Sequence, residues 1–317
     1  MIHLRPLASL RHESVLFALL VIALLLLSAQ SSRFFTLDNL LNQGRLMTEV
    51  SLVAVAMTFV IVAGGIDLSV GSIFGLAAVG MGMLWSSAGL PLPLAMVVAV
   101  LGGIAAGLAN GYIITRFSVP PLITTLATLM LYRGLAEGLS QGRSVRGYPD
   151  WFLQLAHGDW LGVPIQVWLL GACMVVAGVM LDRTAFGRST YAIGANETAA
   201  RFSGIDVRRT KLVIYAVSGA LAAVAGIIFV ARVSTTRSDM GSAMELEVIT
   251  AVVLGGTSIF GGRGSVLGTA LGLALMQALK NGLSLSGIKG DGTIIVIGLV
   301  LIGAIFISNL LNRDRDG

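Results

Sequence analysis

Long stretches of almost uninterrupted apolar residues recur along the 317-residue chain. A helix of about 20 apolar residues spans the hydrocarbon core of a bilayer, which is roughly 30 Å thick. We therefore expect an all-α integral membrane protein with about ten transmembrane helices. The predicted spans are 15–31, 46–63, 70–88, 92–115, 121–139, 163–181, 210–231, 245–262, 265–283 and 292–311.

The composition favours the same class. Hydrophobic residues make up 56% of the chain and charged residues only 12%, whereas a soluble globular domain carries about 25% charged residues. The 40 glycines suit membrane helices that pack closely. The net charge of +5 is expected to mark loops at an anionic membrane surface. We predict no binding of nucleic acid.

Basic residues give the expected orientation, because segments rich in lysine and arginine stay in the cytoplasm. Ten spans then place both termini in the cytoplasm. The predicted organisation is a cytoplasmic N-terminus (1–14), a permease domain (15–311) with a cytoplasmic loop (182–209), and a cytoplasmic tail (312–317). A signal peptide is the alternative for the first span, but no clear cleavage site follows it. The decisive cluster is Arg183, Arg188, Arg201, Arg208, Arg209 and Lys211.

Motifs for catalysis are missing from the sequence. There is no GxxxxGKS or GxxxxGKT loop, HExxH or GxSxG, so we expect no catalytic residue and no cofactor on this chain. Cys173 and three scattered histidines do not form a metal-ligand pattern. An ion-coupled carrier needs ionisable groups near the middle of the membrane. Here most are expected near span ends, which favours a pore or a carrier driven by another subunit: Glu49, Asp67, Glu137, Glu245 and Asp291.

Two glycine-rich stretches are predicted to form turns. In VAGGIDLSVGS (62–72), a glycine pair would end one helix on the cytoplasmic side, and Asp67 or Ser69 would cap the next. An ion site at Asp67 is the alternative. GSIFGLA (71–77) is similar to GSVLGTA (264–270), through either a parallel repeat or chance. The turn residues are Gly64, Gly65, Asp67, Ser69, Gly71, Gly255, Gly256, Gly261 and Gly262.

The basic loop predicts a short helix. Asn196 is a good N-cap, Glu197 complements the helix dipole in the first turn, and Gly204 can end the helix. Ala199, Ala200 and Phe202 would give this helix a small apolar surface. It is either a surface helix on lipid headgroups or a docking helix for a partner protein.

At this loop the chain resembles a known family. GANETAARFSGI (194–205) is similar to the cytoplasmic coupling loop of permease subunits from bacterial ATP-binding-cassette (ABC) sugar importers of the ribose, xylose, rhamnose and autoinducer-2 type. GGIDLSVGS (64–72), ANGYIITRFSVPPLITTLATL (109–129) and ELEVITAVVLGGTSIFGGRGSVLGT (245–269) also resemble family signatures, in order.

The resemblance implies an inner-membrane permease that works as a homo- or heterodimer. Two cytoplasmic ATPase subunits, which bind ATP and Mg²⁺, would drive the pair, and a periplasmic sugar-binding protein would deliver the substrate. ATP-driven closure of the ATPases would switch the pair between inward and outward access. The implied ATPase-coupling residues are Asn196, Glu197, Ala199, Ala200, Phe202 and Gly204.

The sequence says less about which residues line the substrate path and which substrate is transported than about the family. Polar residues in apolar spans either hydrogen-bond sugar hydroxyls or join helices; they are Asn110, Thr124, Thr125 and Thr128. The stretches 234–256 and 282–303 look most similar to rhamnose-type permeases. Many members carry glutamine or lysine near the position of Asp291, and this departure argues against ribose or xylose and favours a deoxyhexose. The alternatives are a self-contained secondary carrier or channel, and a branched-chain amino-acid ABC permease.

Overall fold

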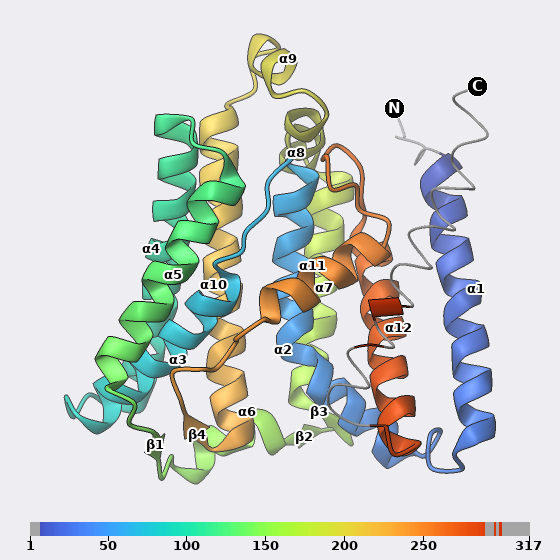
Figure 1. The fold of residues 1–317 in the computed structure, drawn as a ribbon, viewed down its shortest axis with the longest axis vertical. Coiled ribbons are helices and arrows are strands. Elements are labelled where there is room, and N and C mark those ends of the chain that lie inside the picture. The colour runs from blue at the N-terminus through green and yellow to red at the C-terminus, as the bar shows by residue number, and fades with distance from the viewer. Residues whose placement is uncertain (1–6, 289–294, 296–297, 300–317) are drawn as a thin grey trace.

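The computed structural model describes residues 7–288, 295 and 298–299, and the described part is a bundle of helices (Figure 1). The predicted span 292–311 lies outside the described residues except for Ile295, Gly298 and Leu299, and the tail 312–317 lies outside them entirely. The helices are α1 (Leu7–Gln30), α2 (Leu37–Val62), α3 (Val70–Ser86), α4 (Leu92–Phe117), α5 (Pro121–Ser140), α6 (Asp150–His157), α7 (Ile165–Arg183), α8 (Ala185–Ala195), α9 (Glu197–Phe202), α10 (Val207–Val233), α11 (Met244–Leu254) and α12 (Val266–Leu285).

Each of the first nine predicted spans overlaps one of these helices, which supports the all-α class. Within the described residues, five helices are long and apolar enough to cross a membrane: α1, α2, α4, α7 and α10. The helix predicted over 245–262 is shorter than expected, because α11 ends at Leu254 and glycine-rich loop follows. With 11 residues, α11 is about 16 Å long and cannot span the bilayer.

Helices α2 and α10 form the centre of the bundle. In α2, 78% of the most apolar window is buried, and in α10 61%, compared with 17% in α1 and 22% in α7. Helix α10 packs against α4, α3 and α2, and α2 also contacts α7, α11 and α12. Two short antiparallel strand pairs close the end opposite α9 (Figure 1): β1 (Val145–Arg146) with β4 (Thr235–Thr236), and β2 (Asp159–Trp160) with β3 (Val163–Pro164).

Two helices begin inside the bundle rather than at its ends. After α2 the chain turns back into the bundle before α3 begins, and after β4 it rises from the opposite end before α11 begins (Figure 1). The first turn of α3 lies against the segment before α11, because a Cβ on Gly71 would overlap the Gly241 carbonyl and the Glu245 carboxylate. The glycine pair ends α2 as predicted, since the helix stops at Val62 and Gly64 has φ +78°. The residues that follow, however, carry backbone into the interior, where Asp67 and Ser69 are 0% exposed.

The glycines of α4 permit its close crossing with α10. A Cβ on Gly107 would overlap the backbone carbonyl of Tyr215, and a Cβ on Gly219 would overlap that of Gly103. Small residues let membrane helices approach until their backbones touch, which increases van der Waals contact where no hydrophobic effect operates between helices. Gly103, Gly107 and Gly111, spaced four residues apart on α4, thus form the packing surface for α10.

We expect Gly107→Ala to lower the thermal unfolding temperature of the purified protein in detergent, because the added methyl group pushes α4 away from α10. Overpacking of this kind costs about 1–3 kcal/mol. The matched control is Gly102→Ala on the same helix, where a Cβ would meet nothing within 4 Å. Equal effects of the two substitutions would contradict the proposed crossing.

Candidate functional site

Helix α9 projects beyond the end of the bundle, between α8 and α10 (Figure 1). The Asn196 side chain accepts a hydrogen bond from the Ala199 amide at 2.9 Å, and Gly204 leaves the helix with φ +82°. Both features confirm the cap and the stop expected from the sequence, because a side-chain acceptor satisfies a free first-turn amide and glycine tolerates positive φ.

The apolar residues of α9 divide between two faces. Ala200 is buried against Ile193 and Val207, so it fastens α9 to α8 and α10. Ala199 is exposed, and the Phe202 side chain is 89% exposed at the outer face. The predicted apolar surface of α9 is therefore smaller than expected, with Phe202 as its one large member.

Glu197 ties α9 to the start of α10. Its carboxylate accepts hydrogen bonds from Lys211 Nζ at 2.6 Å and from Arg201 Nη2 at 3.1 Å. Partial burial acts to raise the pKa of Glu197, but the hydrogen bond and charge of Lys211, with those of Arg201, outweigh burial and lower the pKa below its ordinary value of 4.5. The carboxylate is thus ionised at neutral pH and holds the two helices together.

The predicted glycine turns meet beside α8. The Gly262 amide donates to the Val62 carbonyl at 2.9 Å. A Cβ on Gly261 would lie within 3 Å of the Gly64 backbone, and one on Gly262 within 3.0 Å of Ala195. Gly261 and Gly262 also have φ of +85° and +73°, values that side chains disfavour. The turns therefore join the end of α2, the end of α8 and the loop after α11.

Inside the bundle, Asp67 is the centre of a buried polar cluster. One carboxylate oxygen accepts from the Ser69 amide at 3.0 Å and from the Ser69 hydroxyl at 2.6 Å. The other accepts from the Ser218 hydroxyl on α10 at 2.9 Å. Asn110 on α4 donates to Ser69 Oγ at 2.8 Å, and Tyr132 on α5 donates to the Asn110 oxygen at 3.3 Å.

This arrangement corrects the predicted helix cap. The Ser69 side chain makes no capping bond to α3, and Asp67 accepts the Ser69 amide instead of an amide of the helix. Asp67, Ser69 and Ser218 are each 0% exposed. The cluster therefore binds the 63–69 segment to α4, α5 and α10, and satisfies polar groups where lipid could not.

The residues suggested for the translocation path lie in the same region. Thr125 donates to the Ile66 carbonyl at 3.0 Å, and Thr128 bonds back to the Thr124 carbonyl at 3.1 Å. All of these side chains are buried, with exposures of 0% for Asn110, 3% for Thr124, 0% for Thr125 and 6% for Thr128. Asn110 and Thr125 thus connect different segments, whereas Thr128 bonds within α5 and the buried Thr124 hydroxyl has no hydrogen-bond partner among the described residues. A role of these residues in a path stays a prediction.

Ionisable groups also lie farther from the span ends than the sequence suggested. Glu49, halfway along α2, is 2% exposed and accepts from Arg232 Nε of α10 at 2.8 Å. Lys280 of α12 pairs with Glu247 of α11. The expectation that ionisable groups lie near span ends is therefore wrong for Glu49 and Asp67. Their burial is compensated by the Arg232 ion pair in the case of Glu49, and by donors from serine side chains in the case of Asp67.

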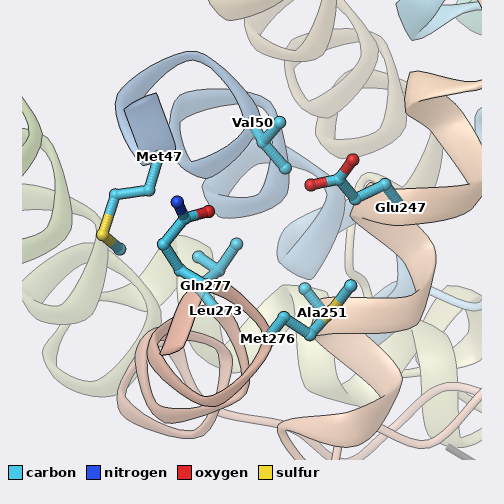
Figure 2. Close-up of a pocket in the computed structure, with 7 residues that line it drawn as sticks. All are labelled: Met47, Val50, Glu247, Ala251, Leu273, Met276 and Gln277. Carbon is cyan, nitrogen blue, oxygen red and sulfur yellow. The ribbon is translucent and has the colours of Figure 1, made fainter. Parts of the chain in front are cut away.

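Glu247 also borders a small cavity between α2, α11 and α12 (Figure 2). Its volume is about 10 Å³, which is about the space of one water molecule, so a monosaccharide does not fit. Among the residues that the structure describes, no group of three or more His, Cys, Asp or Glu side chains could hold a metal ion. The lining residues are Met47, Val50, Glu247, Ala251, Leu273, Met276 and Gln277.

Sequence reasoning missed three features of these sites. Lys211 was counted only as a loop charge, although it is 9% exposed and pairs with Glu197. Ser218 lies 151 residues from Asp67, a separation at which sequence spacing carries no signal. Phe260 falls within the predicted span 245–262 but is 93% exposed. The two glycines that follow it in the sequence are typical of a loop and could have indicated one.

We expect Asp67→Leu to destabilise the protein and Asp67→Asn to be tolerated. Leucine would leave the Ser69 amide and the Ser218 hydroxyl without their partner, at a cost of about 1–3 kcal/mol for each buried group. The Asn amide oxygen can accept from Ser69 while its nitrogen donates to Ser218. Thermal unfolding in detergent tests this order, and a lower unfolding temperature for Asn than for Leu would contradict it.

Comparison with known proteins identifies the chain. A sequence model of the family described as "Branched-chain amino acid transport system / permease component" matches residues 39–305. The ribose import permease protein RbsC of Haemophilus influenzae is 38% identical over 304 residues, covering 94% of each chain. RbsC of Bacillus subtilis is 39% identical over 94% of this chain and 91% of its own. The autoinducer 2 import system permease protein LsrD of Escherichia coli is 37% identical over 92% of this chain and 89% of its own. With a match across most of its length, the chain belongs to this family of transport-system permease components.

Proposed function

We propose that this chain forms the translocation path of an ATP-driven monosaccharide importer and that α9 couples the path to an ATPase. The observation that carries the proposal is α9 itself: a helix projecting from the bundle with Phe202 89% exposed. A projecting aromatic side chain suits burial in a cleft of a partner protein. The names of RbsC and LsrD support import as the direction of transport.

As a member of this family, the chain is a multi-pass ABC transporter permease of the bacterial inner membrane. We place α9 in the cytoplasm because the exposed basic residues at its end favour that side. ATP and Mg²⁺ would bind the ATPase subunits, a second permease chain would complete the path, and a periplasmic protein would deliver the sugar. The exposed basic residues are Arg183, Arg188, Arg201, Arg208 and Arg209.

A contact chain leads from α9 to the interior. Glu197 and Ala200 fasten α9 to α10, so a displacement of α9 acts on α10 directly. Ser218 of α10 donates to Asp67, which belongs to the segment that turns back into the bundle. In this proposal, closure of the ATPases moves α9 and α10, and the 63–69 segment moves with them.

The substrate class is argued from the relatives. Their names give ribose and autoinducer 2, which support a sugar or a sugar-like ligand and do not single out a deoxyhexose. The deoxyhexose preference rests only on the sequence resemblance of the stretches 234–256 and 282–303 and on the departure at Asp291. The family description names branched-chain amino acids, which keeps that alternative open. Thermal shift of the cognate binding protein with ribose, rhamnose and leucine distinguishes the three.

We expect ATP-dependent uptake in liposomes to require the ATPase and the binding protein, and to fall in Phe202→Ala. Loss of a buried Phe costs about 1.5–3 kcal/mol, which corresponds to roughly tenfold or greater weakening of ATPase binding. Phe35→Ala is the matched control, because Phe35 is 53% exposed and belongs to the connection between α1 and α2, which lies at the end of the bundle opposite α9 (Figure 1). Uptake by the purified chain alone would support a self-contained carrier and overturn the proposal.

A further inference from the structure

A second aromatic side chain is exposed at the same end as α9. Phe260, in the loop between α11 and α12, is 93% exposed, and its neighbour Ile259 is 49% exposed. The loop rises beside α8 at the end of the bundle from which α9 projects (Figure 1). Exposed apolar residues are common on proteins, so the argument depends on how Phe260 is held.

The loop that carries Phe260 is fixed in place. The Gly261 amide donates to the Ser258 carbonyl and the Ser258 amide to the Arg263 carbonyl, both at 2.9 Å. Tyr191 of α8 donates its hydroxyl to the Gly264 carbonyl at 2.7 Å. Phe260 is therefore the tip of a closed turn anchored to the bundle. A side chain on such a rigid support loses little conformational entropy when a partner binds.

The loop shares its support with α9. It packs against Gly194 and Ala195 at the end of α8, where a Cβ on Gly194 would come within 2.5 Å of the Gly262 amide nitrogen. The next residue is Asn196, which caps α9. The loop and α9 are therefore anchored at consecutive residues of the chain, 194–195 and 196, at the same end of the bundle.

We propose that residues 258–263, with Phe260 as the anchor, form a second contact with the ATPase subunit that receives α9. This inference rests on the proposed function. Aromatic side chains are enriched at the centres of protein interfaces, and Arg, here the exposed Arg263, is enriched with them. The continuity of the loop with α9 favours the ATPase over lipid or a second permease chain as the occupant.

The second contact would act on α11, which, like α3, begins inside the bundle. The loop continues directly from α11 into α12, and α11 packs against α2 and α3. Through α9 an ATPase acts on α10, and through Phe260 it acts on α11. The two contacts together would move both segments that enter the bundle, one from each half of the chain.

Site-specific photo-crosslinking in the assembled complex tests the contact. Benzoyl-phenylalanine is placed at position 202, 260 or 35 of the full-length permease, co-expressed with its cognate ATPase and binding protein. We expect crosslinks to the ATPase from 202 and 260 and none from 35. A crosslink from 202 without one from 260, or one from 260 to lipid or to the second permease chain, overturns the inference and leaves the proposed function intact. Absence of ATPase crosslinks from both positions overturns the proposed function.

Uptake measurements supply an independent readout. We expect Phe260→Ala to reduce ATP-dependent uptake about tenfold, as loss of roughly 1.4 kcal/mol of contact would, without changing the thermal unfolding temperature, because the side chain is 93% exposed. Phe260→Leu should retain more uptake than Phe260→Ala, and Phe35→Ala should be unchanged. Wild-type uptake by Phe260→Ala, with reduced uptake by Phe202→Ala, would refute the second contact alone.

Discussion

The hydrogen bonds around Asp67 are the interaction on which the rest of this structure depends. A non-helical segment inside a membrane protein exposes backbone groups that lipid cannot satisfy. Here Asp67 and Thr125 supply partners for the segment, and Ser218 and Asn110 link it to α10 and α4. The cluster thus satisfies the polar groups at the point where α3 begins inside the bundle, between α2 and α10.

The close crossing of α4 and α10 complements the polar cluster. Gly107 and Gly219 bring the two backbones into contact, which holds Asn110 of α4 and Ser218 of α10 on either side of the 63–69 segment. Two turns earlier, in the second turn of α10, Lys211 binds Glu197 of α9. One long helix thus connects a surface that suits a partner protein with the polar interior, and a rigid helix transmits displacement along its length.

Part of the fold and of the site was predictable because it depends on local sequence. Apolar runs located the helices, and Asn196 and Gly204 gave the bounds of α9, since capping acts within a few residues. The buried position of Asp67 was not predictable. Its partner Ser218 lies on a helix 151 residues away, and a Gly-Gly-Ile-Asp stretch reads equally well as a surface turn.

The sequence by itself determined that this chain is a helical membrane protein of a transport-permease family, because hydrophobicity over about 20 residues and ordered motifs survive without any knowledge of packing. Only the tertiary structure decided which side chains are buried between helices and which are exposed. Thr124 and Asn110 turned inward, whereas Phe202 and Phe260 remained exposed. The reason is physical: burial depends on what lies opposite a side chain, and distant segments of the chain supply those neighbours.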